Sequence, residues 1–208
     1  MEDCYKVCAR DCVTEFIEKK SRFISYLCCV KTEEQAKEFI EEIQKKHRDA
    51  THNCYAYRLR TPRVERFSDD GEPTGTAGMP MLEVMKKEDV YDVCVVVTRY
   101  FGGILLGGGG LIRAYSRGVS DALTESGYAT FMQSVTVRLT FSYSGFDKVQ
   151  KLLENTVHNK GESDFSDKVS ITLTLKASDC EKTLENIRDT LNGEVEAEEL
   201  SRGFDSFK

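Results

Sequence analysis

Six consecutive residues near the middle of the chain, VCVVVT at positions 93–98, carry no charge and are rich in β-branched side chains. A strand with one solvated face alternates apolar and polar residues, whereas a strand covered on both faces is continuously apolar. The run therefore predicts a strand buried on both faces. Six of the nine residues from Gly102 to Gly110 are glycine, and a helix with one apolar side is expected over 111–126, ending at Gly127.

The chain before this strand alternates between strand-like and helical patterns. Thr32 followed by Glu33 and Glu34 is typical of a helix start, and the apolar spacing predicts a helix that ends near His47. We further expect strands over 4–16, 22–30 and 54–59, a long loop over 60–77, and a short helix over 79–87 entered through Pro80.

The last part of the chain follows a β-α-β-β-α-β order. Strands are expected over 134–143, 162–166, 168–175 and 194–200, and helices over 146–157 and 180–191. This is the order of the ferredoxin-like fold. We predict an α+β protein with an amino-terminal domain, residues 1–131, and a ferredoxin-like carboxy-terminal domain, residues 132–208. Residues after Ser201 are expected to fray.

Composition narrows the location and the class of partner. No segment approaches the roughly 18 apolar residues of a membrane span, and the amino terminus lacks the pattern of a signal peptide, so we expect a cytoplasmic protein with no membrane partner. In that reducing compartment the 8 cysteines are expected to be free thiols. The formal net charge of -6 means that any contact with nucleic acid requires a local basic patch.

The segment SDDGEPTGTAGM, residues 68–79, places Asp69, Asp70 and Glu72 within four positions among glycines. Such carboxylates can hold Mg²⁺, act as acid and base, or select a partner. The alternative is a structural loop whose acids stabilise turns and pair with Arg58, Arg66 or Arg99.

The glycine-rich segment follows a predicted strand and opens a helix, a position where unpaired backbone N–H groups attract anions. We take Gly102, Gly103, Gly109, Gly110, Arg113 and Arg117 as candidates for nucleic-acid or anion binding. Neither common nucleotide-binding fingerprint is present, and close packing of a helix on a sheet is an equal alternative. Arg99 and Tyr100 join this set because basic and aromatic neighbours occur in single-stranded nucleic-acid sites, and we expect Tyr100 rather than Phe101 to be exposed.

His52 and Cys54 are two positions apart on a predicted strand and therefore share a face. They are further candidates, either as a thiol nucleophile with its partner or as part of a metal site. The alternative is a buried cysteine beside a hydrogen-bonded histidine. With three histidines in the chain, a histidine-rich metal centre is not expected, and we predict no metal and no cofactor.

Five segments resemble, in order, the motifs of the YigZ/IMPACT family. They are KKSRFI at 19–24, HNCYAY at 52–57, SDDGEPTGTAGMPML at 68–82, VVVTRYFGG at 95–103 and GGLIRAYS at 109–116. The resemblance is to bacterial members, which lack the extra amino-terminal domain of eukaryotic ones. It implies a first domain similar to domains of ribosomal proteins and elongation factor G, a ferredoxin-like second domain, and a link to translation. One departure is Leu105, where the family usually has a lysine, which removes a charge from the glycine-rich segment.

We therefore expect a translation-associated regulatory or nucleic-acid-binding protein without enzymatic activity, whose partners are RNA or ribosome-associated proteins. Two alternatives stay open. One is a metal-dependent hydrolase of a phosphorylated or nucleotide substrate that uses the acids at 69, 70 and 72. The other is a protein-interaction adaptor. The oligomeric state is not predicted.

Overall fold

The computed structural model describes residues 4–207, and the chain divides into two compact units, one of residues 5–129 and one of residues 130–207 together with Cys4. The two-domain α+β architecture predicted from the sequence is confirmed. All 8 cysteines are free thiols, as expected. No helix among the described residues is both long enough and apolar enough to cross a membrane.

The amino-terminal unit is built on an antiparallel sheet of five strands in the order β2-β3-β7-β4-β5. Its strands are β2 (Cys12–Glu18), β3 (Ser21–Cys29), β4 (His52–Leu59), β5 (Val64–Ser68) and β7 (Val93–Tyr100). Outside this five-stranded sheet, β1 (Cys4–Cys8) pairs in parallel with β6 (Val90–Tyr91). Strand β7 lies in the middle of the sheet, and every residue from Val93 to Arg99 is buried, as the uncharged run predicted.

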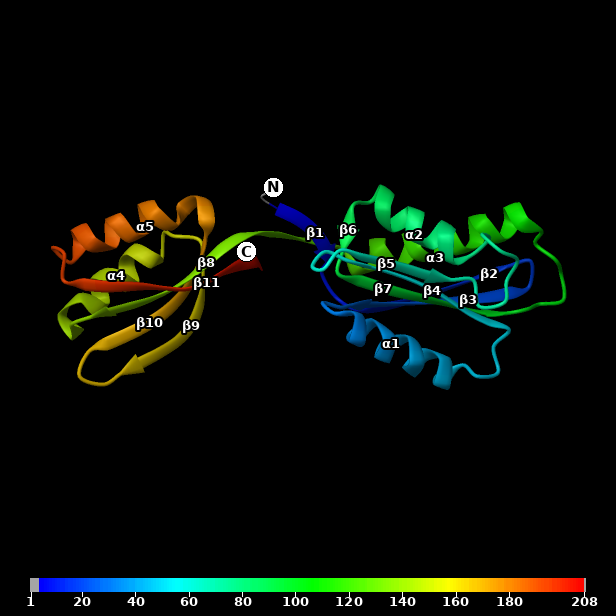
Figure 1. The fold of residues 1–208 in the computed structure, drawn as a ribbon, viewed down its shortest axis with the longest axis horizontal. Helices are drawn as coiled ribbons and strands as arrows, with labels where there is room; N and C mark the ends of the chain where they lie inside the picture. The colour runs from blue at the N-terminus through cyan, green and yellow to red at the C-terminus, as the bar shows by residue number, and fades with distance from the viewer. Residues whose placement is uncertain (1–3, 208) are drawn as a thin grey trace. The chain divides into compact units, whose positions relative to one another are not determined.

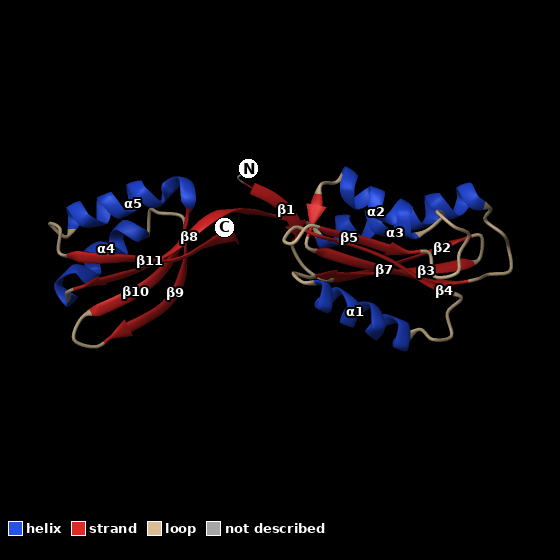
Figure 2. Cartoon of the chain, in the orientation of Figure 1, coloured by secondary structure: helices blue, strands red, loops and turns tan. Residues whose placement is uncertain are grey.

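Helices cover both faces of this sheet (Figures 1 and 2). Helix α1 (Glu33–Lys46) packs on one face, where Ile40 and Ile43 join a cluster with Val96. Helices α2 (Gly78–Lys87) and α3 (Gly108–Ser126) pack on the other, in a cluster that includes Met81 and Tyr115. Burial of apolar side chains on both faces explains why β7 has no polar alternation.

The helix boundaries follow local signals in the sequence. The Thr32 side chain accepts a hydrogen bond from the Gln35 N–H and begins α1, and His47 ends it, as predicted. Gly127 ends α3 with a φ of 68°, a left-handed conformation that favours glycine.

Two expectations for this unit are wrong. The predicted strand 4–16 is interrupted at residues 9–11, where the Ala9 N–H turns to bond the carbonyl of Gly127, so β1 and β2 pair in different sheets. The predicted loop 60–77 contains the edge strand β5. Its backbone pairs with β4 although Phe67 is exposed and the surrounding composition is that of a loop.

The carboxy-terminal unit has strands β8 (Tyr128–Phe141), β9 (His158–Phe165), β10 (Val169–Lys176) and β11 (Val195–Ser206) and helices α4 (Phe146–Leu153) and α5 (Ala177–Thr190), with a short 3-10 turn at Tyr143–Gly145. The strand order β11-β8-β10-β9, all antiparallel, is that of the predicted ferredoxin-like fold. The expectation that residues after Ser201 fray is wrong, because β11 pairs with β8 as far as Ser206 opposite Phe131.

Candidate functional site

A buried ion pair in the amino-terminal unit joins a loop, the ends of two strands and the middle of helix α3. Arg99, near the end of β7, donates from Nη1 to Glu72 Oε1 at 2.6 Å, and the Tyr115 hydroxyl of α3 donates to the same oxygen at 2.7 Å. Arg99 Nη2 also donates to Ser21 Oγ of β3 at 3.4 Å. The pair thus connects segments that are distant in the sequence.

Arg99 is therefore not available as a nucleic-acid contact, which corrects the sequence-based expectation. Its side chain is 6% exposed, and its guanidinium faces the Phe23 and Phe101 rings as well as Glu72. A buried arginine needs a partner because desolvation of an isolated charge is costly. The alternative prediction, that an acid of the 68–79 segment pairs with an arginine, is confirmed for Glu72, which pairs with Arg99.

The expectation that Tyr100 rather than Phe101 is exposed is also wrong. Its hydroxyl donates to Asp49 Oδ1 at 3.2 Å and lies 2.8 Å from His47 Nδ1. Because the hydroxyl proton is directed to Asp49, the tyrosine oxygen accepts from His47 Nδ1–H. Phe101, which carries no polar group, is the aromatic residue that faces solvent, at 45% exposure.

The three acids at 69–72 are occupied by donors of the protein itself. Asp69 accepts from the backbone N–H groups of Gly75, Ala77 and Gly78 at 2.8 to 3.0 Å, and this closes the loop that enters α2. Asp70 Oδ2 accepts from the N–H of Asn53 at 2.6 Å. Carboxylates that satisfy several backbone donors have fewer lone pairs left for a cation, so this arrangement favours the structural role.

His52 and Cys54 lie on β4, and both bond the loop of residues 69–77, which we call the acid loop. His52 Nδ1 donates to the Asp70 carbonyl at 2.7 Å, which leaves Nε2 3.7 Å from Glu72 Oε2. The Cys54 thiol donates to the Asp69 carbonyl at 2.9 Å. Burial raises the pKa of the Cys54 thiol far above its usual range, so the thiolate needed for nucleophilic attack is not populated near neutral pH.

A pocket of about 200 Å³ opens between the β2–β3 turn and α3, and basic side chains line it. Lys19 reaches it from the turn, while Arg113 and Arg117 reach it from successive turns of the helix. Phe16 forms part of the wall, with the Arg117 guanidinium 4.3 Å from its ring centre. We call this the cationic pocket; Glu18 is the acid at its rim.

The glycine-rich segment shapes the approach to the cationic pocket. The first backbone hydrogen bond of α3 runs from the Leu111 N–H to the Gly107 carbonyl. The N–H groups of the glycines before Leu111 therefore have no acceptor within the helix. Among them, Gly110 lines the pocket and Gly109 packs close to Arg113, since a Cβ at Gly109 would lie 3.5 Å from Arg113 Nη1. The arginine charge is thus near the positive end of the helix.

Gly102 and Gly103 lie before the helix, and Gly102 packs against the backbone of the β2–β3 turn. The Gly102 N–H donates to Ser21 Oγ at 3.2 Å, and a Cβ on Gly102 would overlap the carbonyl of Lys20. Gly103 has a φ of 82° and begins the exposed part of the segment. These glycines permit close packing of loop on hairpin, which was the alternative to an anion site.

Three residues that the sequence did not mark as site candidates complete this region. Lys19 stands in the motif KKSRFI, which was a signal for it, and it has a φ of 45° in the two-residue turn between β2 and β3. Ile104 and Leu105 are 41% and 81% exposed, and with Phe101 they place apolar side chains at the surface of the glycine-rich segment. The replacement of a charged residue at position 105 was the signal for this apolar surface.

Comparisons with known proteins match both units. The model of the Impact N-terminal domain matches residues 19–123, and that of a domain of unknown function, DUF1949, matches residues 139–194. The IMPACT family member YvyE of Bacillus subtilis (strain 168) is 40% identical over 186 residues, which cover 89% of this chain and 86% of that protein.

Two further relatives extend the comparison. The IMPACT family member YigZ of Escherichia coli (strain K12) is 48% identical over 110 residues, 51% of this chain and 54% of that protein. A solved structure described as that of a hypothetical protein is 31% identical, with a TM-score of 0.63, and the match covers 97% of this chain and 99% of that one.

Proposed function

The chain belongs to the IMPACT family, and from that premise we propose that it is a translation-associated, non-enzymatic protein that binds RNA phosphates in the cationic pocket. The family resemblance supplies the link to translation. The pocket supplies the chemistry, because phosphate oxygens accept hydrogen bonds from arginine, lysine and helix N-terminal N–H groups alike.

The observation that carries the proposal is the convergence of three cations from two separate segments. Lys19 comes from a hairpin turn, and Arg113 and Arg117 come from a helix whose first turn faces the same opening. Arg117 pairs with Asp121 at 3.2 Å, whereas no ion pair is found for Lys19 or Arg113 within residues 4–207. Unpaired cations near a helix N-terminus favour an anionic ligand.

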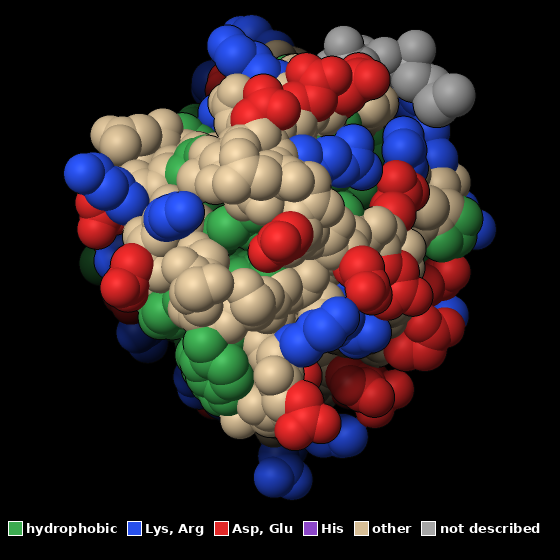
Figure 3. Space-filling model, turned by 90° about the vertical axis from the view of Figure 1, so that its left-hand side faces the viewer, with side chains coloured by type: hydrophobic (Ala, Val, Ile, Leu, Met, Phe, Trp, Pro, Cys, Tyr) green, Lys and Arg blue, Asp and Glu red, His purple; other side chains and the backbone are tan. Residues whose placement is uncertain are grey.

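Such a local site is compatible with the acidic chain as a whole. The formal net charge is -6, so the average field repels RNA. On the face of the carboxy-terminal unit turned to the viewer in Figure 3, acidic and basic side chains are interspersed. Binding through a small cationic pocket predicts modest affinity with a shallow dependence on salt.

The proposal is tested by RNA binding as a function of salt. Fluorescence anisotropy with a labelled single-stranded RNA should give an affinity that falls with salt, and Arg113→Ala and Lys19→Ala should each reduce the slope of log K against log salt by about 0.7 to 0.9. Arg66→Ala is the matched control, because Arg66 is exposed on β5, near Glu33 of α1 on the opposite side of the sheet. An affinity that ignores salt, or equal losses in all three variants, would contradict RNA binding at the pocket.

A second candidate, a protein-interaction adaptor, is favoured by one observation. Phe101, Ile104 and Leu105 expose apolar side chains along the glycine-rich segment. Clustered exposed apolar residues are typical of protein contacts. Capture of ribosomal proteins from lysate that survives ribonuclease treatment and is lost in Leu105→Lys would support the adaptor. Capture that ribonuclease abolishes and Leu105→Lys preserves would support RNA binding.

A further inference from the structure

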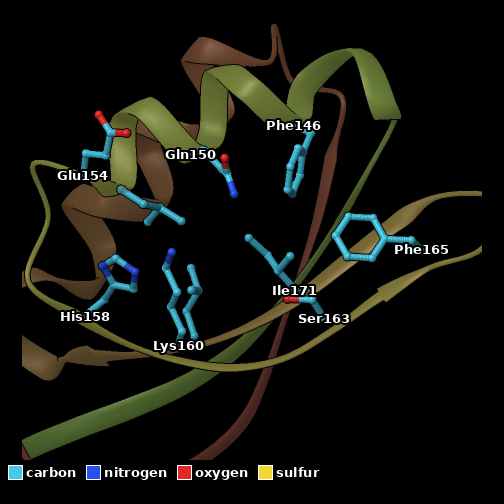
Figure 4. A pocket seen from close by; sticks show the side chains of 10 residues that line it. Phe146, Gln150, Glu154, His158, Lys160, Ser163, Phe165 and Ile171 are labelled. Carbon is cyan, nitrogen blue, oxygen red and sulfur yellow. The ribbon is translucent and has the colours of Figure 1, made fainter.

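The carboxy-terminal unit contains a second pocket, of about 240 Å³, between helix α4 and strands β9 and β10 (Figure 4). Its apolar wall includes Phe146 from α4, Phe165 from β9 and Ile171 from β10. The two phenylalanine rings meet edge to face, with centres 5.4 Å apart and planes at 76°. Aromatic edges and faces in this arrangement suit a flat aromatic ring.

A β-bulge in β9 brings the residues of that strand to the pocket. Lys160 pairs with Leu173 and Ser163 pairs with Ile171, so two residues of β9 lie opposite the single residue Thr172 of β10. Gly161 sits in this bulge, and a Cβ there would lie 3.1 Å from the Thr172 carbonyl oxygen. Without the extra residue, positions 160 and 163 would face opposite sides. The bulge lets both line the pocket.

One end of the pocket is polar and contains an unsatisfied acceptor. His158 Nδ1 donates to the Thr156 carbonyl at 2.8 Å, so Nε2 of the neutral ring carries a lone pair. That Nε2 is buried and has no hydrogen-bond partner among the described residues. A buried polar atom without a partner costs about 1 to 3 kcal/mol, and a ligand that donates a hydrogen bond would relieve this cost.

A positive charge, that of Lys160, is directed to the same polar end of the pocket. Lys160 lies two positions after His158 on the same strand, and both line the pocket. Figure 4 shows the Lys160 ammonium and the Gln150 amide directed inward and the Glu154 carboxylate directed away from the pocket. The arrangement offers one cation, one amide and one acceptor beside an aromatic wall.

We infer that this pocket binds a small aromatic carboxylate with an amino or hydroxyl group next to the carboxylate. The carboxylate accepts from Lys160 and Gln150, the neighbouring donor bonds His158 Nε2, and the ring lies against Phe146 and Phe165. The volume of about 240 Å³ lies below the roughly 300–1,000 Å³ of pockets for larger ligands, so the occupant is a compact molecule. The site is independent of the cationic pocket.

The test uses the full chain and the probe anthranilate, with two analogues that each lack one group. In two-dimensional NMR, anthranilate should shift the amide signals of β9 and α4 saturably. Anthranilamide, which lacks the negative charge, and benzoate, which lacks the donor, should each bind about tenfold more weakly. Equal affinity for all three, or no shift up to the solubility limit, would overturn the inference.

Variants assign the binding to the pocket. Lys160→Met keeps the alkyl chain and removes the charge, and it should erase the preference for anthranilate over anthranilamide. His158→Asn preserves a donor near the position of Nδ1, removes Nε2, and should erase the preference over benzoate. Lys182→Met, an exposed substitution on α5, is the control and should leave both preferences intact. If Lys182→Met and Lys160→Met weaken binding alike, or if the two pocket variants fold and retain both preferences, the inference is wrong.

Discussion

Glu72 and Arg99 form a buried ion pair, with 2.6 Å between Oε1 and Nη1, that holds the acid loop against the central strand of the amino-terminal sheet. The Tyr115 hydroxyl of α3 donates to Glu72, and Ser21 Oγ of β3 accepts from Arg99. The pair therefore connects four of the five segments that carry the family motifs. The pair thus joins the acid loop, β7, α3 and β3 through one buried group of hydrogen bonds.

Loss of one partner of this pair should destabilise the fold strongly. Glu72→Ala leaves a buried guanidinium without its acceptor, and we expect a loss of about 3 to 5 kcal/mol in the free energy of unfolding. Chemical denaturation of wild type, Glu72→Ala, Arg99→Met and the double variant measures this loss of unfolding free energy. The double variant should lose less than the sum of the single ones. Additive losses would contradict the pairing.

Asp69 should be important for the order of the acid loop. Asp69→Ala removes the acceptor of three backbone N–H groups, and we expect a loss of about 3 kcal/mol together with faster amide exchange at Gly75, Ala77 and Gly78. Hydrogen exchange and denaturation measure both effects. Glu83→Ala, at an exposed position of α2, should change neither. Unchanged exchange in Asp69→Ala would refute this role.

Gly102 should tolerate no side chain. Gly102→Ala places a Cβ where the Lys20 carbonyl lies, and separation of the loop from the hairpin should cost about 1 to 3 kcal/mol. In Gly108→Ala the new Cβ meets Thr76 at an ordinary 3.9 Å, so this variant of the same segment should stay near wild-type stability. Thermal unfolding compares the two, and equal midpoints would show that the contact can relax.

The stability of the amino-terminal unit should fall in mild acid because of His47. Burial lowers the pKa of His47, with a further lowering from Lys46, and its ring nitrogens bond the hydroxyls of Tyr26 and Tyr100. Around and below the ordinary pKa of 6.5 His47 is protonated to a greater extent in the unfolded chain than in the folded one, so the free energy of unfolding decreases as pH falls from there toward the lower folded-state pKa.

Urea denaturation at about pH 7.5 and about pH 5.5 measures this dependence. Between them the wild type should lose more stability than His47→Gln, which keeps a donor and an acceptor but does not titrate. A parallel loss in both proteins would assign the pH dependence to other groups.

Local signals in the sequence were sufficient for most of the fold. The uncharged run at 93–98, the Thr32 cap and Gly127 each encode their element within a few residues, and the β-α-β-β-α-β order specifies the second unit. The family resemblance carried by the motifs is confirmed by the matches to both units. Strand β5 was missed because its pairing with β4, not its composition, makes it a strand.

The site was harder to predict because burial depends on contacts between distant segments. In the sequence Arg99 and Glu72 cannot be told from surface charges, and only the packing of the acid loop against β7 buries them as a pair. Lys19 joins Arg113 only when the β2–β3 turn packs beside α3. In β9 the bulge changes the alternation between residues 160 and 163, so a period-two pattern could not reveal which side chains share a face.

The cationic pocket, shared between a hairpin turn and a helix far along the chain, also links occupancy to thermal stability. A synthetic peptide spanning 99–117 contains Arg113 and Arg117 but neither Lys19 nor the wall formed by Phe16. Because the complete pocket exists only in the native state, an anion that binds it stabilises the folded chain over the unfolded one, and we expect the melting temperature to rise with the concentration of that anion.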